Sequence, residues 1–190
     1  MAPMHLRLLA AGFLLLAACA EETSVPTQQD PLAQLNVDQV IYGLEHVMTT
    51  RGVRKAILHG DTAYFRDADS RVDLKGVKLD FFNETTGATT GTLTSRTGEY
   101  DMRTGAMTAR GNAVLTLQGP SGTRTISSEE LNYDVQGDRI WSDKPTVMRE
   151  GGREVRGTSF QSDTKFQNVT VQTPRATGPG PGGSGGGIRF

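Results

Sequence analysis

The sequence predicts an all-β domain built from repeated strand pairs. Apolar and polar residues alternate with period two over long stretches, which is typical of strands with one buried face. Clusters of Gly, Asn, Asp, Ser and Pro interrupt these stretches where hairpins are expected to reverse. One short residue pattern also recurs along the chain, which indicates that a single structural unit is used several times.

The overall composition leaves room for one ordinary domain and excludes some partners. The chain has 190 residues, with 20 Lys and Arg against 21 Asp and Glu, for a formal net charge of −1. No basic block stands out, so nucleic acid is not an expected partner. The one cysteine lies in the N-terminal segment, so the folded part contains no disulfide of its own.

Residues 1–18 have the features of a lipoprotein signal peptide. A positively charged start precedes the apolar run Leu8–Leu16, which is shorter than the roughly 20 residues of a permanent transmembrane helix. The sequence Leu-Ala-Ala-Cys that ends at Cys19 matches a lipobox, the motif at which bacteria attach diacylglycerol to the thiol. We therefore expect lipidation of Cys19 and anchoring to a membrane. The alternative is an ordinary signal peptide that happens to contain a cysteine.

The segments on either side of the domain have compositions that do not bury a core. Residues 19–35 are polar and form the predicted tether between the lipid and a domain at 36–173. Residues 174–190 are rich in Gly and Pro and are predicted to be a disordered tail. Ala20 follows the cysteine where an Asp is the signal for retention at the inner membrane, which favours the outer membrane.

The repeat is clearest in the second half of the domain. The frame that runs from Leu93 to Asp101 recurs 33 positions later from Ile126 to Asp134, and 29 positions after that from Val155 to Asp163. A looser copy begins at Leu58. The domain is therefore expected to contain about four copies of one strand-pair unit.

Alternation within the units predicts where the strands bend and where the sheet ends. Val72 and Leu74 have the opposite parity to Val77, Leu79 and Phe81, so the pattern slips by one residue at Gly76. A bulge or bend there keeps both halves of a long strand facing the same interior. The first strand is predicted at 39–48, where Gly43 argues against a short amphipathic helix, and the last at 166–172. These two strands are the candidate docking edges.

The residues that form this pattern resemble the LptC family of lipopolysaccharide-export proteins, which is related to the bridge protein LptA and the OstA-like superfamily. The resemblance is carried by Leu131–Asp134, Ser142–Pro145 and Glu154–Asp163, within the run of repeated strand pairs from about residue 40 to 171. It implies a twisted open β-jellyroll of two antiparallel sheets, with an apolar groove for acyl chains. The best-known LptC pattern has a transmembrane helix where this sequence has the lipobox.

The resemblance also implies a function and its partners. The chain is expected to be a membrane-anchored periplasmic component of lipopolysaccharide export, docking end to end with an LptA-like bridge protein and an inner-membrane transporter. By family resemblance the anchor lies in the inner membrane. The alternative is a scaffolding envelope lipoprotein with a closed core that binds other proteins and carries no lipid.

The candidate groove residues are apolar positions that share the predicted inner face. Most of them are equally compatible with ordinary core packing. They are Leu58, Leu74, Leu79, Phe81, Leu93, Met107, Leu115, Ile126, Leu131, Ile140, Val147 and Phe160.

The sequence carries no persuasive catalytic or metal-binding motif, so an enzyme, a cofactor and a metal are not expected. His46 and His59 stand apart from any Cys or carboxylate at ligand spacing. The acidic residues between 61 and 73 do not fit a calcium loop. Glu129 and Glu130 are adjacent in a predicted strand and point to opposite faces, which excludes simple acid/base cooperation.

Overall fold

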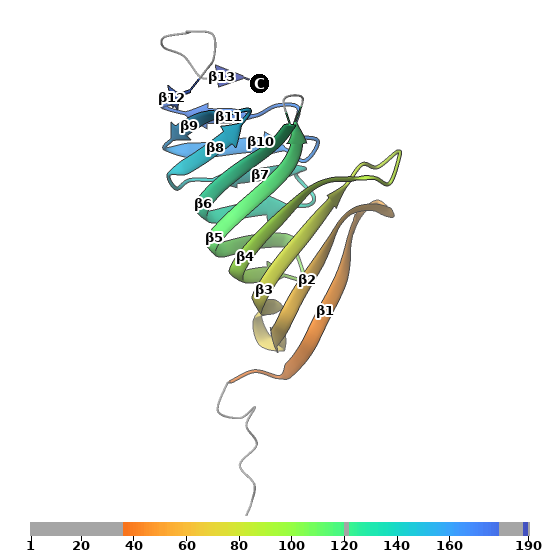
Figure 1. Cartoon of the computed structure of the whole chain (residues 1–190). Coiled ribbons are helices and arrows are strands. Elements are labelled where there is room, and N and C mark those ends of the chain that lie inside the picture. The colour runs from red at the N-terminus through yellow and green to blue at the C-terminus, as the bar shows by residue number, and fades with distance from the viewer. Residues whose placement is uncertain (1–35, 120–121, 179–187, 190) are drawn as a thin grey trace, which may run out of the picture. The chain divides into compact units, whose positions relative to one another are not determined.

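A computed structural model describes residues 36–119, 122–178 and 188–189 of the chain (Figure 1). These residues form antiparallel strands and one short 3₁₀ helix, η1 (Asp67–Asp69), which confirms the predicted all-β class. The predicted signal peptide and tether, including Cys19, lie outside the described residues. The strands are β1 (Gln39–Thr50), β2 (Val53–Arg66), β3 (Arg71–Phe82), β4 (Thr89–Asp101), β5 (Ala106–Gly119), β6 (Gly122–Asp134), β7 (Arg139–Ser142), β8 (Thr146–Glu150), β9 (Arg153–Gly157), β10 (Ser159–Asp163), β11 (Thr170–Gln172), β12 (Arg175–Thr177) and β13 (Ile188–Arg189).

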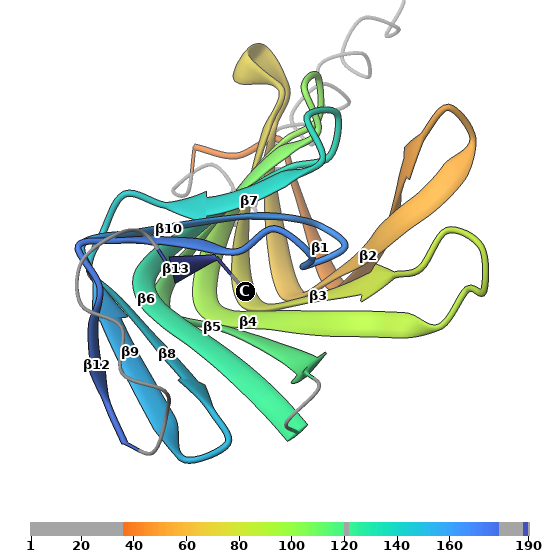
Figure 2. The ribbon, with the colours of Figure 1, turned by 90° about the horizontal axis from the view of Figure 1, so that it is seen from above.

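The sheet is a meander that divides at β6. Strands β1 to β6 pair in chain order, each with the next. The first half of β6 then pairs with β8, and its second half pairs with β7. One branch continues from β7 through β10 and β11 to β13, and the other from β8 through β9 to β12. The two branches can be followed in Figure 2.

The long strands β1 to β6 all bend along one line that crosses the sheet. Gly76 on this line has φ +62°, and Gly43 and Gly111 have φ +65° and +75°. Pairing on both sides of Gly76 keeps one register, so β3 bends there without an inserted residue, whereas β5 carries a bulge beside Gly111. The residues along the line are Gly43, Asp61, Gly76, Arg96, Gly111 and Glu129.

The bend reverses which parity of residue faces inward. In β3, Val72 and Leu74 are buried before the line, and Val77, Leu79 and Phe81 are buried after it. This confirms the predicted slip at Gly76. The buried parity changes in the same way in the other long strands except β5, where the bulge beside Gly111 adds a residue and Ala109 and Ala113 both stay buried. Both halves of each long strand therefore line one common interior.

Charged side chains of neighbouring strands occupy the space beside two of these glycines. A Cβ built on Gly76 collides with the Asp61 carboxylate, and one built on Gly111 lies 3.1 Å from Nε of Arg96. By contrast, a Cβ on Gly52, in the turn between β1 and β2, meets nothing within 4 Å although its φ is also positive, at +77°. The line therefore needs glycine for close approach as well as for backbone conformation.

This difference predicts unequal costs for two similar substitutions. Gly76→Ala is expected to lower the free energy of unfolding by about 1–3 kcal/mol more than Gly52→Ala, since both pay for a positive φ but only the first overpacks. Urea unfolding of both variants measures the difference. Adding Asp61→Ala to Gly76→Ala, with the Asp61→Ala single variant as reference, is expected to recover most of it. Equal losses for the two alanines would contradict the close-approach argument.

The last predicted strand was placed too early in the chain. Strand β11 covers Thr170–Gln172, whereas Phe166 lies in the loop before it with φ +55°. The loop is held by Asp163, whose carboxylate accepts hydrogen bonds from the Gln167 amide at 2.9 Å and the Asn168 side-chain amide at 2.6 Å. The sheet also continues past residue 173, because β12 pairs with β9 and β13 with β11.

Candidate lipid-binding interior

The predicted groove residues come together, with one exception, in a single buried cluster. Phe81 is the centre of an aromatic group, with its ring centroid 5.2 Å from that of Tyr133 and 5.7 Å from that of Phe166, both in edge-to-face contact. The other predicted members that are buried in the same cluster are Leu58, Leu74, Leu79, Leu93, Met107, Leu115, Ile126, Leu131, Ile140 and Phe160.

Val147 is the exception. In β8 the buried residues are Thr146 and Met148, and Val147 is half-buried on the opposite face. The register explains this, because Met148 lies directly opposite Ile126 of β6, and residues opposite each other in an antiparallel pair share a face. Met148, 3% exposed, therefore takes the place in the interior that the sequence analysis gave to Val147.

Several interior residues were not among the predicted groove residues. Tyr133 follows Leu131 by two positions in β6 and is 1% exposed, so strict period two would have found it. Tyr100 of β4 is also buried, and its hydroxyl lies 3.0 Å from Nε2 of His46 on β1. These polar aromatic groups make the interior apolar in bulk but not uniformly so.

The apolar interior reaches the surface at its margins. Ile41, Leu44 and Phe65, from β1 and β2, and Phe166, from the loop before β11, are only partly buried yet pack against the core. Half-buried apolar side chains at the boundary of a core are the positions that an acyl chain would contact first.

Polar contacts between turns close the margin near Phe166. Nζ of Lys55 lies 2.5 Å from Oε1 of Glu84 and 3.9 Å from Oδ1 of Asp138. The Thr50 hydroxyl donates a hydrogen bond of 3.1 Å to the carbonyl oxygen of Val135. The turns that follow β1 and β3 project side by side in Figure 2. We call this margin the turn rim, defined by Arg51, Arg54, Lys55, Glu84, Asp138 and Lys165.

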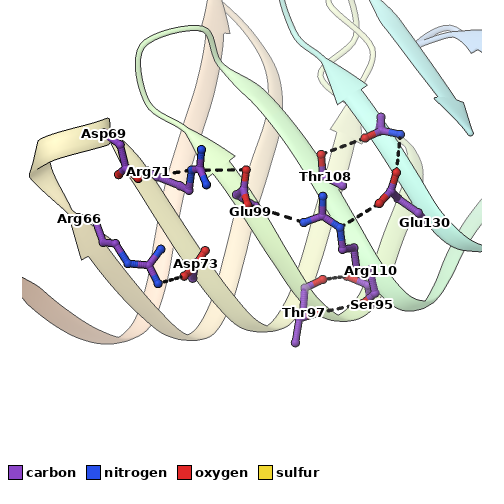
Figure 3. A network of polar contacts seen from close by, with 11 residues as sticks. Arg66, Asp69, Arg71, Asp73, Ser95, Thr97, Glu99, Thr108, Arg110 and Glu130 are labelled. Carbon is purple, nitrogen blue, oxygen red and sulfur yellow. Dashed lines mark hydrogen bonds and ion pairs between the residues drawn. The ribbon is translucent and has the colours of Figure 1, made fainter. Parts of the chain in front are cut away.

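The outer face of the same sheet is polar, and its charged side chains form ion pairs with one another. Figure 3 shows Arg110 between Glu99, at 3.8 Å, and Glu130, at 2.9 Å, while Arg66 pairs with Asp73 at 2.5 Å. Such exposed pairs contribute about 0–1 kcal/mol each, so their main effect is to keep this face wet and free of apolar patches. Binding of an apolar ligand is therefore expected inside the bent sheet.

Comparison with known proteins assigns the family. The family model described as "Lipopolysaccharide-assembly, LptC-related" matches residues 6–174, which is most of the chain. The chain belongs to the LptC family. It is thereby a periplasmic component of lipopolysaccharide transport and not an enzyme, as the sequence analysis expected.

The fold of this LptC-family chain also resembles a solved structure. LptH from Pseudomonas aeruginosa, described as the LptA homologous periplasmic component of the lipopolysaccharide transport device, superposes with a TM-score of 0.50. The two sequences are 15% identical, and the match covers 66% of this chain and 95% of LptH. At this identity the likeness concerns the fold alone. No curated protein matches the chain.

Two further features of the described part of the LptC-family chain concern membranes and metals. The part of the chain that the structure describes contains no helix long and apolar enough to span a bilayer. Among the same residues, no group of three His, Cys, Asp or Glu side chains is arranged to hold a metal ion. Two of the acidic residues between 61 and 73 pair with arginines: Asp69 lies 3.8 Å from Arg71, and Asp73 lies 2.5 Å from Arg66.

His46 gives the LptC-family interior a titratable contact. Its ring lies 5.2 Å from that of Tyr100, and burial lowers the pKa of His46. Burial, and to a lesser extent the nearby Asp101 carboxylate, raises the pKa of the Tyr100 hydroxyl, which stays protonated at neutral pH. The folded state therefore favours neutral His46.

Neutral His46 predicts a loss of stability in mild acid. Below about pH 6.5, the ordinary pKa of histidine, the unfolded chain binds a proton at His46 that the folded chain resists. The contribution of His46 is thus full above this pH and is lost as the pH falls through the folded pKa. In the His46→Gln variant, the urea midpoint of unfolding is expected to change less between about pH 7 and 5.5 than in the unmodified chain. Parallel pH profiles for the two proteins would show that His46 titrates as in the unfolded state.

Proposed function

We propose that this LptC-family chain carries the acyl chains of lipopolysaccharide between the two halves of its bent sheet while a lipid on Cys19 holds it at a membrane. The observation that carries the proposal is the interior itself, an apolar cluster that runs from Met48 of β1 to Val171 of β11. Only its margins, at Ile41, Leu44, Phe65 and Phe166, are partly exposed.

Access to this interior requires the halves of the sheet to part. The bend line joins them on one side, and the turn rim closes the other through the contacts of Lys55 with two partly exposed carboxylates, Glu84 and Asp138. Contacts of this kind are weak compared with the buried core, so the rim is the margin that opens at the least cost. An entering acyl chain replaces side-chain contacts such as Phe81 with Phe166, and burial of its methylene groups offsets that loss.

The ends of the sheet suit strand-to-strand docking. Strand β1 begins the path of paired strands, so one of its edges has no partner within the described residues. Tyr42, 79% exposed, and Val47, 46% exposed, lie on this strand. We propose that the β1 edge pairs with one partner of the export bridge, and that the end formed by β12 and β13, where the two branches of the sheet finish, faces the next. Family resemblance favours an anchor in the inner membrane, and Ala20 after the cysteine favours the outer membrane.

A scaffolding role remains the second candidate, for a specific reason. The side chains of Leu58, Leu79, Leu93 and Leu131 are 0% exposed, as in an ordinary closed core. A lipoprotein with such a core binds envelope proteins through its strand edges and carries no lipid.

Photo-crosslinking in cells separates the two functions. A photoreactive phenylalanine analogue at Phe81, Leu79 or Leu131 is expected to form adducts with lipopolysaccharide if acyl chains enter. The matched control is Lys78, which neighbours Leu79 in β3 and is exposed on the opposite face. Adducts at Leu79 and none at Lys78 support transport. Protein adducts alone, or equal labelling at both positions, support the scaffold.

A further inference from the structure

The turn rim gathers positive charge from segments that are distant in the sequence. Arg51 lies in the turn after β1, Arg54 and Lys55 lie at the start of β2, and Lys165 lies in the loop after β10. Against these four cations the rim has two carboxylates, Glu84 and Asp138. The chain as a whole has a net charge of −1, so the excess of positive charge is specific to the turn rim.

Asp138 links the segments that carry these cations, because it lies 3.9 Å from Lys55 and accepts a hydrogen bond from the hydroxyl of Thr164, the residue before Lys165. Lys55 donates a hydrogen bond to Glu84. The pKa of Glu84 lies below its ordinary value, mainly because of this contact and to a smaller extent because of the charges of Lys165 and Arg51. The Arg54 guanidinium stacks over the Phe82 ring at 4.0 Å and donates to the carbonyl oxygen of Gly87 at 3.4 Å. Stacking leaves further Arg54 donors free for an anion.

Two other carboxylates of the same turns and loops accept hydrogen bonds within their own segments. Asp134 accepts hydrogen bonds from the backbone amides of Gln136 and Gly137, each at 3.0 Å. Asp163 holds the loop that carries Lys165 through its bonds to Gln167 and Asn168. Both carboxylates are therefore held by donors of their own turn or loop.

The same rim borders the apolar interior. Phe166 follows Lys165 directly, and its ring packs edge-on against Phe81 at 5.7 Å between centroids. The Lys55 side chain is only 13% exposed, and its ammonium is positioned by the ion pair with Glu84. A cationic rim beside a partly exposed apolar margin is complementary to an amphiphile with an anionic head.

We infer that the turn rim is a binding site for the phosphate groups on the headgroup of the carried lipid, with Lys55 and Lys165 as its main ligands and Arg51 and Arg54 beside them. The inference rests on the proposed function, since it assumes that acyl chains enter next to Phe166. On entry, the phosphate accepts part of the hydrogen bonding that Lys55 otherwise donates to Glu84. The closed rim is thereby loosened by the lipid that passes it.

Binding of two matched lipids to the intact lipoprotein tests the site. Fluorescent lipid A with its phosphates, and the same lipid after their removal, are titrated against the full chain in neutral detergent. The unmodified chain is expected to bind the phosphorylated form about tenfold more tightly at low salt, with the preference falling as salt is added. Lys55→Gln with Lys165→Gln is expected to bind both forms equally, at the affinity of the dephosphorylated lipid.

A charge-matched control is available on the outer face. Lys75→Gln with Lys78→Gln removes the same charge from exposed positions of β3 and is expected to keep the tenfold preference. Lys165→Gln alone changes an exposed loop position and keeps the Lys55 ion pair. It therefore tests the site even if the loss of that ion pair destabilises the fold. A preference that survives in the Lys55 and Lys165 variants, or disappears equally in the control, overturns the site.

Two other results have distinct meanings. Displacement of the phosphorylated lipid by millimolar inorganic phosphate alone identifies a free-phosphate site and overturns the assignment to a lipid headgroup. Failure of the unmodified chain to bind either lipid overturns the proposed transport function together with this site. Binding of both lipids without a preference overturns the site and leaves transport standing.

Discussion

Replacing Leu131 with aspartate is expected to unfold the domain or to leave it close to unfolding. Leu131 is 0% exposed in the interior of β6, opposite Ala109 of β5. An uncompensated charge at a buried position costs about 3–5 kcal/mol or more, in addition to the lost packing of the leucine. Domains of this size are stable by about 5–15 kcal/mol, so one substitution removes a large fraction of the total.

Urea unfolding followed by circular dichroism measures this effect. Leu131→Met, which keeps volume and polarity, is expected to cost less than about 1.5 kcal/mol. Thr123→Asp places the same charge at an exposed position of the same strand and is expected to cost at most about 0.5 kcal/mol. If Leu131→Asp unfolds at the midpoint of the unmodified chain, the side chain does not lie in an apolar interior.

Replacing Cys19 with serine is expected to release the protein from the membrane. Serine has no thiol to accept the diacylglycerol, and each buried methylene of an acyl chain contributes about 0.8 kcal/mol to anchoring. Loss of whole chains therefore changes the partition by many orders of magnitude. The measurement is the distribution between membrane and soluble fractions, together with the mass of the N-terminal peptide.

Two variants of Ala20 accompany the Cys19 experiment. Ala20→Ser is the control and is expected to leave both lipidation and location unchanged. Ala20→Asp is expected to keep the protein at the inner membrane if the residue after the cysteine decides sorting. Retention of Cys19→Ser in the membrane fraction would contradict the lipobox and point to an uncleaved N-terminal segment.

The local features of the fold were predictable because they are written in short stretches of sequence. Period two identified the strands, and the parity change between Leu74 and Val77 located the bend at Gly76. Both depend only on a strand having one buried face. The same rule, applied strictly, would also have included Tyr133.

The features that failed or were missed depend on contacts between distant segments. Val147 was misplaced because the two consecutive apolar residues Val147 and Met148 leave the parity of β8 open, and only the pairing of β8 with Ile126 and Ser127 decides it. Phe166 was placed in a strand because the capping of its loop by Asp163 has no strong local signal. The turn rim joins Lys55 to Asp138, which no local pattern connects.

The line of bends across β1 to β6 has a consequence for how related chains are expected to differ in length. Adding one residue to a strand normally moves every later side chain to the opposite face of the sheet. At the bend line the pairing tolerates a change in which residues face the interior, and the bulge in β5 shows that an extra residue is accommodated there. Single-residue gains and losses among relatives should therefore collect beside Gly43, Gly76 and Gly111 and be absent from the stretches between.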